Sequence, residues 1–262
     1  MSGRQMPPGG AEPVEQRDHY SYTVYADPAT ARAFDDRRFG GPIGELVAST
    51  QARVLASFIG ELSGRSILDV GTGTGRAALL LAGRGARVTG IDASDEMLAV
   101  ARQRAAADGL SVQFLSGDAH ALDFPDRSFE VAVSLRLLMH TPEWRACLAE
   151  LCRVADRLVV FDYPSARSLA ALQAAARRVA HLGGVRTEPY RVFTDRSIVQ
   201  ELERSGFRVR SSHRLFVLPI ACHKAIGSRR FTEWSERLLA RIGLLRMLGS
   251  PVTLIAQRCE SS

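Results

Sequence analysis

Three glycines at alternate positions form the first candidate ligand-binding element of this sequence. They are Gly71, Gly73 and Gly75, and they follow the apolar run Ile67–Val70 directly. A strand, a tight glycine turn and a helix start leave backbone N–H groups free and let a ligand approach the main chain. Asp69 stands two residues before the first glycine, where a carboxylate repels a pyrophosphate and attracts an ammonium or sulfonium group. The turn is therefore predicted to hold a cationic amino-acid moiety.

The same turn departs from the dinucleotide fingerprint GxGxxG. The third glycine of that fingerprint falls five residues after the first, and this sequence has Arg76 at that position. An NAD-dependent oxidoreductase is therefore the less favoured alternative. It would bind NAD tightly and tolerate Asp69→Ala.

Two further acids follow the next two predicted strands. Asp92 stands 21 residues after Gly71, and a carboxylate there can accept hydrogen bonds from both hydroxyls of a ribose. Asp118 follows the third strand, where an acid can meet the exocyclic amine of adenine while the Ala119 N–H meets the ring edge. Amino acid, ribose and adenine in this order specify S-adenosylmethionine (SAM). The structural alternatives are a turn-forming role for Asp69 and a helix-capping role for Asp118.

Four motifs between about Ser66 and Ser165 carry a family resemblance. They read ILDVGTGTGRAALLLA, VTGIDASDEMLAVAR, GDAHALDFPDRSFEVAVS and EWRACLAELCRVAD. Together they resemble the class I SAM-dependent methyltransferases of the type-11 group, which includes the ubiquinone and menaquinone C-methyltransferases. The rest of the chain resembles this family only in its layout of two further strands.

The resemblance implies a set of cofactor-binding residues, all at or just after the ends of predicted strands. Met97 is the least specific of them, since a methionine on a helix also suits the core. The set comprises Asp69, Gly71, Thr72, Gly73 and Gly75 around the methionine part, Asp92 at the ribose, Ala93, Met97, Asp118 and Ala119 around the adenine, and Leu135 and Arg136 under the methyl donor.

Methyl transfer from SAM requires an aligned nucleophile, exclusion of water and in some cases a proton acceptor. His140 is the candidate general base, because an imidazole titrates near neutrality and this one follows the fourth predicted strand. A positioning or capping role is its alternative, and Asp162 is a weaker candidate base. The segment LRLLMHTPEW lacks the [D/N]PP[Y/F] motif of amino-directed enzymes, which favours a carbon or oxygen acceptor.

Short β-branched runs alternate with helical segments, and this alternation predicts the elements that position these residues. It indicates an α/β fold with a doubly wound, mostly parallel, Rossmann-like sheet of seven strands. Strands are expected at Ser66–Val70, Arg87–Ile91, Val112–Ser116, Glu130–Leu135, Leu158–Asp162, Phe207–Phe216 and Val252–Ala256. Helices are expected at Pro28–Arg37, Ile43–Leu62, Arg76–Gly83, Asp95–Ala107, Pro142–Val154, Ser165–His181, Asp195–Ser205 and Ala221–Leu248.

The pattern divides the chain into three parts. Residues 1–18, rich in proline, glycine and charge, are expected to be a disordered tail. Residues 19–63 are expected to form a helical lid, and residues 64–262 the SAM-binding domain with helical cap elements at about 165–190 and 217–249. The alanine, leucine and aromatic side chains of these caps favour a lipophilic acceptor such as a quinone or polyketide, with core packing as the alternative.

The composition of the chain bears on three kinds of binding partner: nucleic acids, metal ions and membranes. The net charge is +6, but the arginines are spread along the chain without a basic stripe, so nucleic-acid binding is not expected. The four cysteines lack metal-ligand spacing, and no metal is expected. The N-terminal residues lack a signal peptide and no apolar run could span a bilayer, which indicates a cytoplasmic protein. Peripheral membrane contact is a hypothesis, since arginines flank apolar positions in one helical segment: Arg229, Arg230, Arg237, Arg241 and Arg246.

We therefore predict a SAM-dependent methyltransferase acting on carbon or oxygen of a small lipophilic acceptor. A SAM-binding regulatory protein without catalysis is the main alternative. The sequence does not specify the acceptor or the oligomeric state.

Overall fold

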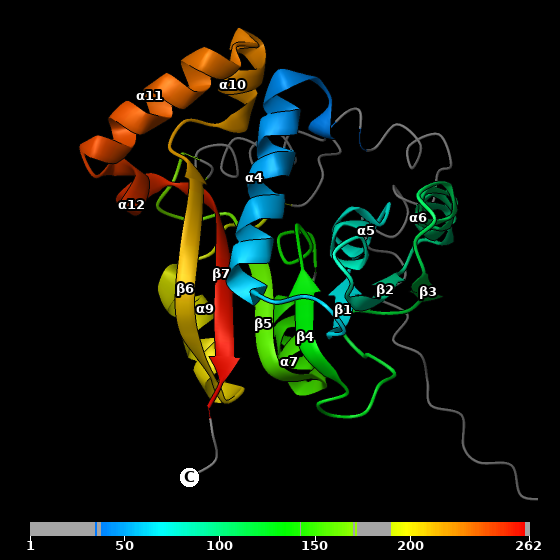
Figure 1. The fold of residues 1–262 in the computed structure, drawn as a ribbon. Coiled ribbons are helices and arrows are strands. Elements are labelled where there is room, and N and C mark those ends of the chain that lie inside the picture. Colours follow the sequence, from blue (N-terminus) through cyan, green and yellow to red (C-terminus); the bar gives the residue numbers. More distant parts are fainter. Residues whose placement is uncertain (1–34, 36–37, 142, 170, 172–189, 260–262) are drawn as a thin grey trace, which may run out of the picture.

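The computed structural model describes residues 35, 38–141, 143–169, 171 and 190–259 of the 262-residue chain (Figure 1). The predicted tail 1–18, most of the predicted helix Pro28–Arg37 and most of the predicted helix Ser165–His181 lie outside the described residues. Of the latter helix, residues 165–169 form a β-bridge and turns instead, because Ser165 pairs with Phe193.

A seven-stranded sheet with the order β3-β2-β1-β4-β5-β7-β6 forms the centre of the molecule. Strands β1 to β5 pair in parallel, and β7 runs antiparallel to both β5 and β6. The order reverses between β1 and β4, which is where open α/β sheets bind ligands. The predicted doubly wound, mostly parallel sheet is confirmed. Its strands are β1 Ser66–Val70, β2 Arg87–Asp92, β3 Val112–Ser116, β4 Phe129–Ser134, β5 Ala155–Tyr163, β6 Phe207–Phe216 and β7 Ser250–Arg258.

Helices cover both faces of this sheet. Because side chains alternate along a strand, Ile67 joins the core under α4, α5 and α6, and Leu68 joins the core under α7 and α9. Figure 1 shows α4 on the near side of the sheet and α7 behind it. The helices are α4 Gly41–Ile59, α5 Arg76–Ala82, α6 Asp95–Ala107, α7 Trp144–Val154, α9 Asp195–Arg204, α10 Ile220–Ile226, α11 Arg229–Arg241 and α12 Leu244–Leu248.

Several boundaries differ from the predicted ones for identifiable reasons. Helix α4 begins at Gly41, because Pro42 fits the first turn of a helix, where no N–H is needed. The predicted helical segment Ala221–Leu248 is confirmed as largely helical, and it is divided into three helices. Gly227 and Gly243 interrupt it in the left-handed conformation, with φ of 69° and 82°.

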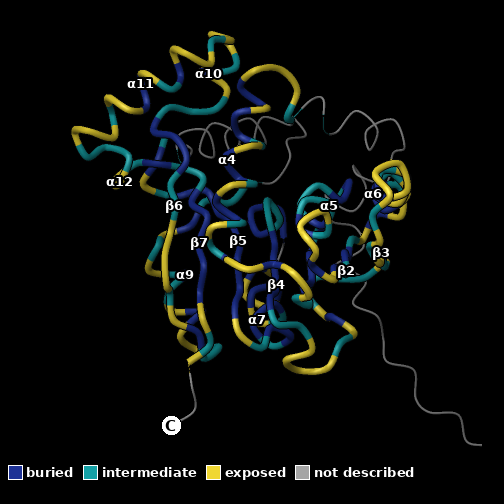
Figure 2. The backbone as a smooth tube through the Cα atoms, viewed as in Figure 1, coloured by how far each residue is buried: buried dark blue, intermediate teal, exposed yellow. Residues whose placement is uncertain are grey.

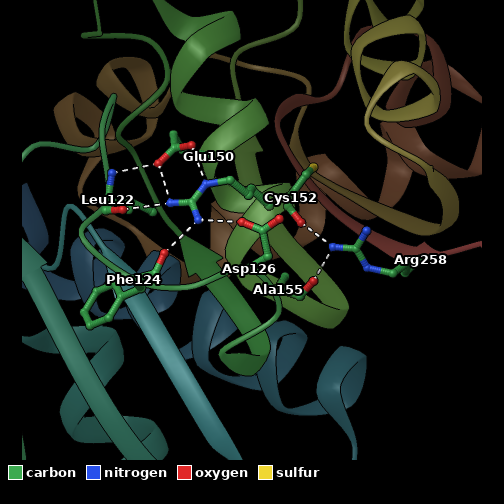
Figure 3. Close-up of polar contacts among 8 residues, drawn as sticks. Leu122, Phe124, Asp126, Glu150, Cys152, Ala155 and Arg258 are labelled. Carbon is green, nitrogen blue, oxygen red and sulfur yellow. Dashed lines mark hydrogen bonds and ion pairs between the residues drawn. The ribbon is translucent and has the colours of Figure 1, made fainter.

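Two arginines hold the end of α7 in place (Figure 3). Arg258 of β7 donates to the carbonyls of Cys152 and Ala155 at 2.6 and 2.5 Å, where the helix leaves carbonyls without partners. Arg153 donates to the carbonyls of Leu122 and Phe124, both at 2.7 Å. The bonds of Arg153 join the β3–β4 connection to α7, and those of Arg258 join β7 to the end of α7 and the start of β5. Both sets lie at the end of β4 and β5 opposite their carboxyl termini.

Candidate functional site

The carboxyl ends of β1, β2 and β4 line one cleft. Its empty volume of ≈ 1180 Å³ includes open solvent at its mouth. Residues before α4 and residues after β3 complete the wall. The predicted site residues in the lining are Asp69, Gly71, Thr72, Gly73, Asp92, Ala93, Met97, Ala119, Leu135, Arg136 and His140.

The glycine turn has the backbone geometry that the sequence predicted. Gly71 and Gly73 have φ angles of 71° and 55°, which residues other than glycine rarely adopt. A Cβ on Gly71 would lie 3.0 Å from Leu137 Cδ1, so the turn and the β4 loop approach closely. The amides of Gly71 and Thr72 both donate to the Ile91 carbonyl, at 2.8 and 2.9 Å. The turn is thereby fixed against β2.

Asp69 is a buried carboxylate at the base of the turn. Its Oδ2 accepts a 2.7 Å hydrogen bond from the Thr72 hydroxyl. Burial raises the pKa of Asp69 to about 6, although the hydrogen bonds from Thr72 and the Ala78 backbone oppose the rise. A cation placed beside this carboxylate would be attracted to it and would favour its ionised form.

Asp92 ends β2 and presents a second carboxylate to the cleft. Its Oδ2 accepts from the Gly73 N–H at 2.8 Å, and its Oδ1 accepts from the Ser94 N–H at 3.0 Å. Burial also raises the pKa of Asp92, against these backbone hydrogen bonds. The glycine turn and the end of β2 are thus joined through one side chain.

Two predicted residues are not among those that line the cleft. Asp118 turns toward His120, whose N–H and Nδ1 lie 2.9 and 2.7 Å from its Oδ1. Its neighbours Gly117 and Ala119 do line the cleft, so the loop after β3 reaches the cleft beside Asp118. Gly75 faces the core, where an added Cβ would lie 3.0 Å from the Cβ of Ala101.

The loop after β4 forms the wall opposite the glycine turn. Arg136 has a φ of 63°, and its N–H donates to Oδ1 of the fully buried Asp162 at 2.5 Å. His140 is buried and its N–H donates to the Leu137 carbonyl at 2.9 Å. Asp162 therefore fixes the backbone of this loop through the Arg136 amide, and the same loop carries Leu137 and His140, which line the cleft.

Several lining residues were not predicted as site residues. The guanidinium of Arg76 lies 3.5 Å from the centre of the Phe39 ring, and its Nη2 donates to Gln51 Oε1 at 2.8 Å. The Thr74 hydroxyl donates to Asp35 at 3.1 Å. The sequence did single out Arg76, since a basic residue at the third-glycine position has no role in a dinucleotide-binding turn. Its partners could not be read from spacing.

Within the described ranges, no group of three or more His, Cys, Asp or Glu side chains could hold a metal ion. Over the same residues, no helix is long and apolar enough to cross a membrane.

Comparison with known proteins agrees with the geometry. A model described as a methyltransferase domain matches residues 67–157. The demethylmenaquinone methyltransferase of Thermus thermophilus is 43% identical over 109 residues, 40% of this chain and 50% of that protein. The chain thus spans half the length of that relative. The demethylmenaquinone methyltransferase of Tropheryma whipplei is 30% identical over 192 residues, 66% of this chain and 79% of that protein.

A solved structure shares the fold. Magnesium protoporphyrin IX methyltransferase from Synechocystis, with bound SAH, superposes with a TM-score of 0.63 at 22% identity. The match covers 90% of this chain and 99% of that one. At this identity the likeness concerns the fold alone.

Proposed function

Since this chain belongs to the class I SAM-dependent methyltransferases of the menaquinone and ubiquinone type, we propose that it methylates carbon or oxygen of a small lipophilic acceptor. SAM is its cofactor, and when bound it supplies an activated methyl group on a sulfonium. The acceptor class is suggested by the quinone methyltransferases to which the chain is similar. A quinone or a related apolar metabolite is the acceptor we favour.

The observation that supports the proposal best is the pair of carboxylates in one cleft, the buried Asp69 and the half-buried Asp92. The first would hold the ammonium of SAM, together with the backbone of the glycine turn. The second would hold the ribose hydroxyls. The loops after β2 and β3 would enclose the adenine through Ala93, Met97 and Ala119, with Asp118 setting the conformation of the second loop.

The cleft also suits an apolar acceptor. Leu135, Leu137 and Phe39 line it near the loop after β4, so part of the wall beside the proposed methyl donor is apolar. His140 lies in the same wall and would accept a proton from an acceptor hydroxyl or carbon acid. Such an acceptor partitions into membranes, and we include peripheral contact with a membrane in the proposal.

Calorimetric titration with SAM tests the cofactor assignment. We expect Asp92→Ala to weaken SAM binding by at least about tenfold, because the ribose loses a charge-assisted hydrogen-bond acceptor. Asp123→Ala is the matched control, since Asp123 is exposed and does not line the cleft. Unchanged affinity in Asp92→Ala would count against the proposed role of Asp92.

A methyl-transfer assay over a panel of demethylated quinols and phenols separates the enzyme from a regulatory SAM-binding protein. We expect turnover of at least one apolar acceptor, and a loss of about 10² to 10⁴ in kcat for His140→Asn with SAM affinity retained. A chain that binds SAM and methylates nothing in the panel would favour the regulatory alternative.

A further inference from the structure

The described part of the chain carries its exposed large apolar side chains in one segment. All of them lie between residues 226 and 247, in α10, α11 and α12 or, for Ile242, at the C-cap of α11, and these helices project at one end of the molecule (Figure 1). Four of them recur on one side of α11 and form what we call the apolar ridge: Phe231, Trp234, Leu238 and Ile242. Trp234 and Ile242 are 62% and 65% exposed. Figure 2 shows the tube of α11 alternating between exposed and buried positions along its length.

The opposite side of α11 is polar and buried, which inverts the usual arrangement of a surface helix. Glu236 accepts hydrogen bonds from the amides of Val217 and Leu218, at 2.7 and 3.0 Å. His223, fully buried, lies between Glu236 and Thr232, with ring nitrogens 2.9 and 3.0 Å from their oxygens. Turning the apolar ridge inward would break these bonds and leave buried polar groups without partners. The fold therefore holds the ridge in solvent.

A row of arginines runs beside the apolar ridge. Arg230, Arg237 and Arg241 recur with the spacing of Phe231, Leu238 and Ile242, each one residue earlier, and all three are exposed. Residues 220–248 contain six basic side chains and two carboxylates. Of these carboxylates, Glu236 is buried, and Glu233 pairs with Arg229 and Arg237. Within the described residues, Arg230, Arg241 and Arg246 have no ion-pair partner.

We propose that α11 and α12 dock on the surface of an anionic lipid bilayer, with the apolar ridge at the acyl boundary and the arginine row at the phosphates. A helix with aromatic and leucine side chains beside a basic face has the composition of interfacial membrane helices. A second copy of the chain fits less well, because two ridges packed together would bring two arginine rows into mutual repulsion.

The apolar ridge lies at the same end of the sheet as the cleft, so docking on a membrane would bring the cleft close to an apolar acceptor. Only this role of the docking rests on the proposed function. Strand β6 runs parallel to β1 and β4, so it ends at Phe216 on the edge of the sheet where the cleft opens. The segment 220–248 follows directly, and Figure 1 shows it at that end of the molecule. A docked α11 would turn this end of the sheet toward the lipid in which an apolar acceptor is dissolved.

Flotation of the full chain with vesicles of phosphatidylcholine, with and without phosphatidylglycerol, tests the docking. We expect binding to the anionic vesicles that weakens with salt. Neutralising Arg230, Arg241 and Arg246 to Gln should weaken it roughly a hundredfold, at about fivefold per arginine. Neutralising Arg84, Arg208 and Arg210, which are exposed elsewhere, removes the same charge and should change binding little.

Tryptophan fluorescence gives a second readout that needs no variant. The chain has two tryptophans, of which Trp144 is buried and Trp234 stands on the ridge. We expect a blue shift with anionic vesicles, and its loss in Trp234→Ser.

Three results would overturn the docking proposal: absence of anionic-vesicle binding at low salt, equal loss in both arginine triples, or a dimer in sedimentation that Trp234→Ser dissociates. SAM affinity, measured in parallel, separates failure of the docking from failure of the proposed function.

Discussion

At the scale of single residues, the cleft contains one carboxylate that the fold has buried away from water, Asp69. Burial raises the pKa of Asp69 to about 6, so its protonated form is favoured in the native state. The native state thus binds more protons than the unfolded chain between about pH 4 and 6. The stabilisation from protonated Asp69 is full below the unfolded pKa, and it is lost as pH rises through about 6. The ligand-free protein pays this cost at neutral pH, and a bound cation would offset it.

The affinity for SAM should therefore depend on pH through Asp69. Below about pH 6 the carboxyl is protonated, and a cationic ligand must displace the proton before it gains the electrostatic attraction. We expect SAM affinity to rise between about pH 5 and 7 and then to level off. Titration calorimetry in buffers of different ionisation enthalpy would also detect the released proton.

Asp69→Asn is the test of this assignment, because the amide keeps an acceptor for Thr72 and cannot ionise. It should bind SAM more weakly at pH 7 and with little dependence on pH over the same range. A pH dependence that survives unchanged in Asp69→Asn would assign the titration to another group, with Asp92 the next to examine.

At the scale of elements, sequence patterns predicted the parts whose local and tertiary signals agree. Strand β1 alternates between two cores, and α6 begins at a capping serine, Ser94, whose hydroxyl accepts from the Met97 N–H. Both elements were predicted with their observed bounds. In α11 the helix itself was predictable, but its orientation was not. Its outward apolar face depends on a buried partner from α10, His223, which no periodicity in α11 could reveal.

The site could be predicted to a similar extent. Residues tied to strand ends, such as Asp69 and Asp92, followed from the strand pattern. Phe39 and Gln51 precede Arg76 by 37 and 25 residues in the sequence, and their contacts with Arg76 depend on where α4 packs. The side-chain direction of Asp118 depends on its hydrogen bonds to His120, which is a matter of rotamer.

The buried network under α11 should be more sensitive to mutation than the exposed face of the same helix. Glu236→Gln replaces one carboxylate oxygen with a donor that faces the Val217 or Leu218 amide, so one buried N–H loses its acceptor. We expect a loss of about 1 to 3 kcal/mol in the free energy of unfolding, measured by urea denaturation.

Glu233→Gln on the same helix is the control, because its ion pairs with Arg229 and Arg237 lie at the surface. The urea midpoint should hardly move in this variant. Equal shifts in the two variants would show that the buried network contributes no more than surface pairing.

Gln51 links α4 to two other elements through one amide. Its Oε1 accepts from Arg76 of α5, and its Nε2 lies 3.4 Å from Oδ2 of Asp162 in β5. Gln51→Ala should cost about 1 to 3 kcal/mol of stability, because Arg76 and Asp162 are left under-satisfied in the interior. Ser57→Ala, on the exposed side of α4, provides the comparison and should stay within about 0.5 kcal/mol. A cost for Gln51→Ala no larger than that of Ser57→Ala would mean that water replaces the amide.

At the scale of the whole molecule, one end of the sheet is braced and the other is open to ligands. Arg153 and Arg258 bind carbonyls around α7 at the braced end, and the cleft and the apolar ridge lie at the open end. The two carboxylates whose pKa is raised by burial, Asp69 and Asp92, lie at this open end. A ligand that satisfies these groups should stabilise the entire fold, since β1, β2 and β4 run through its centre.

Thermal unfolding with and without cofactor measures this coupling. At a SAM concentration of about 100 times the dissociation constant, binding to the native state alone adds about 2.7 kcal/mol. For a chain of this size that corresponds to a rise of roughly 5 to 10 °C in Tm. SAH shares the amino acid, ribose and adenine of SAM and should give a comparable rise in Tm.

NAD offers a pyrophosphate to the turn beside Asp69 and should give no rise in Tm, because the carboxylate repels it. A rise with NAD equal to that with SAM would restore the dinucleotide interpretation of the glycine turn. Asp92→Ala should remove most of the SAM-induced rise while Asp123→Ala keeps it, which ties the stabilisation to the cleft.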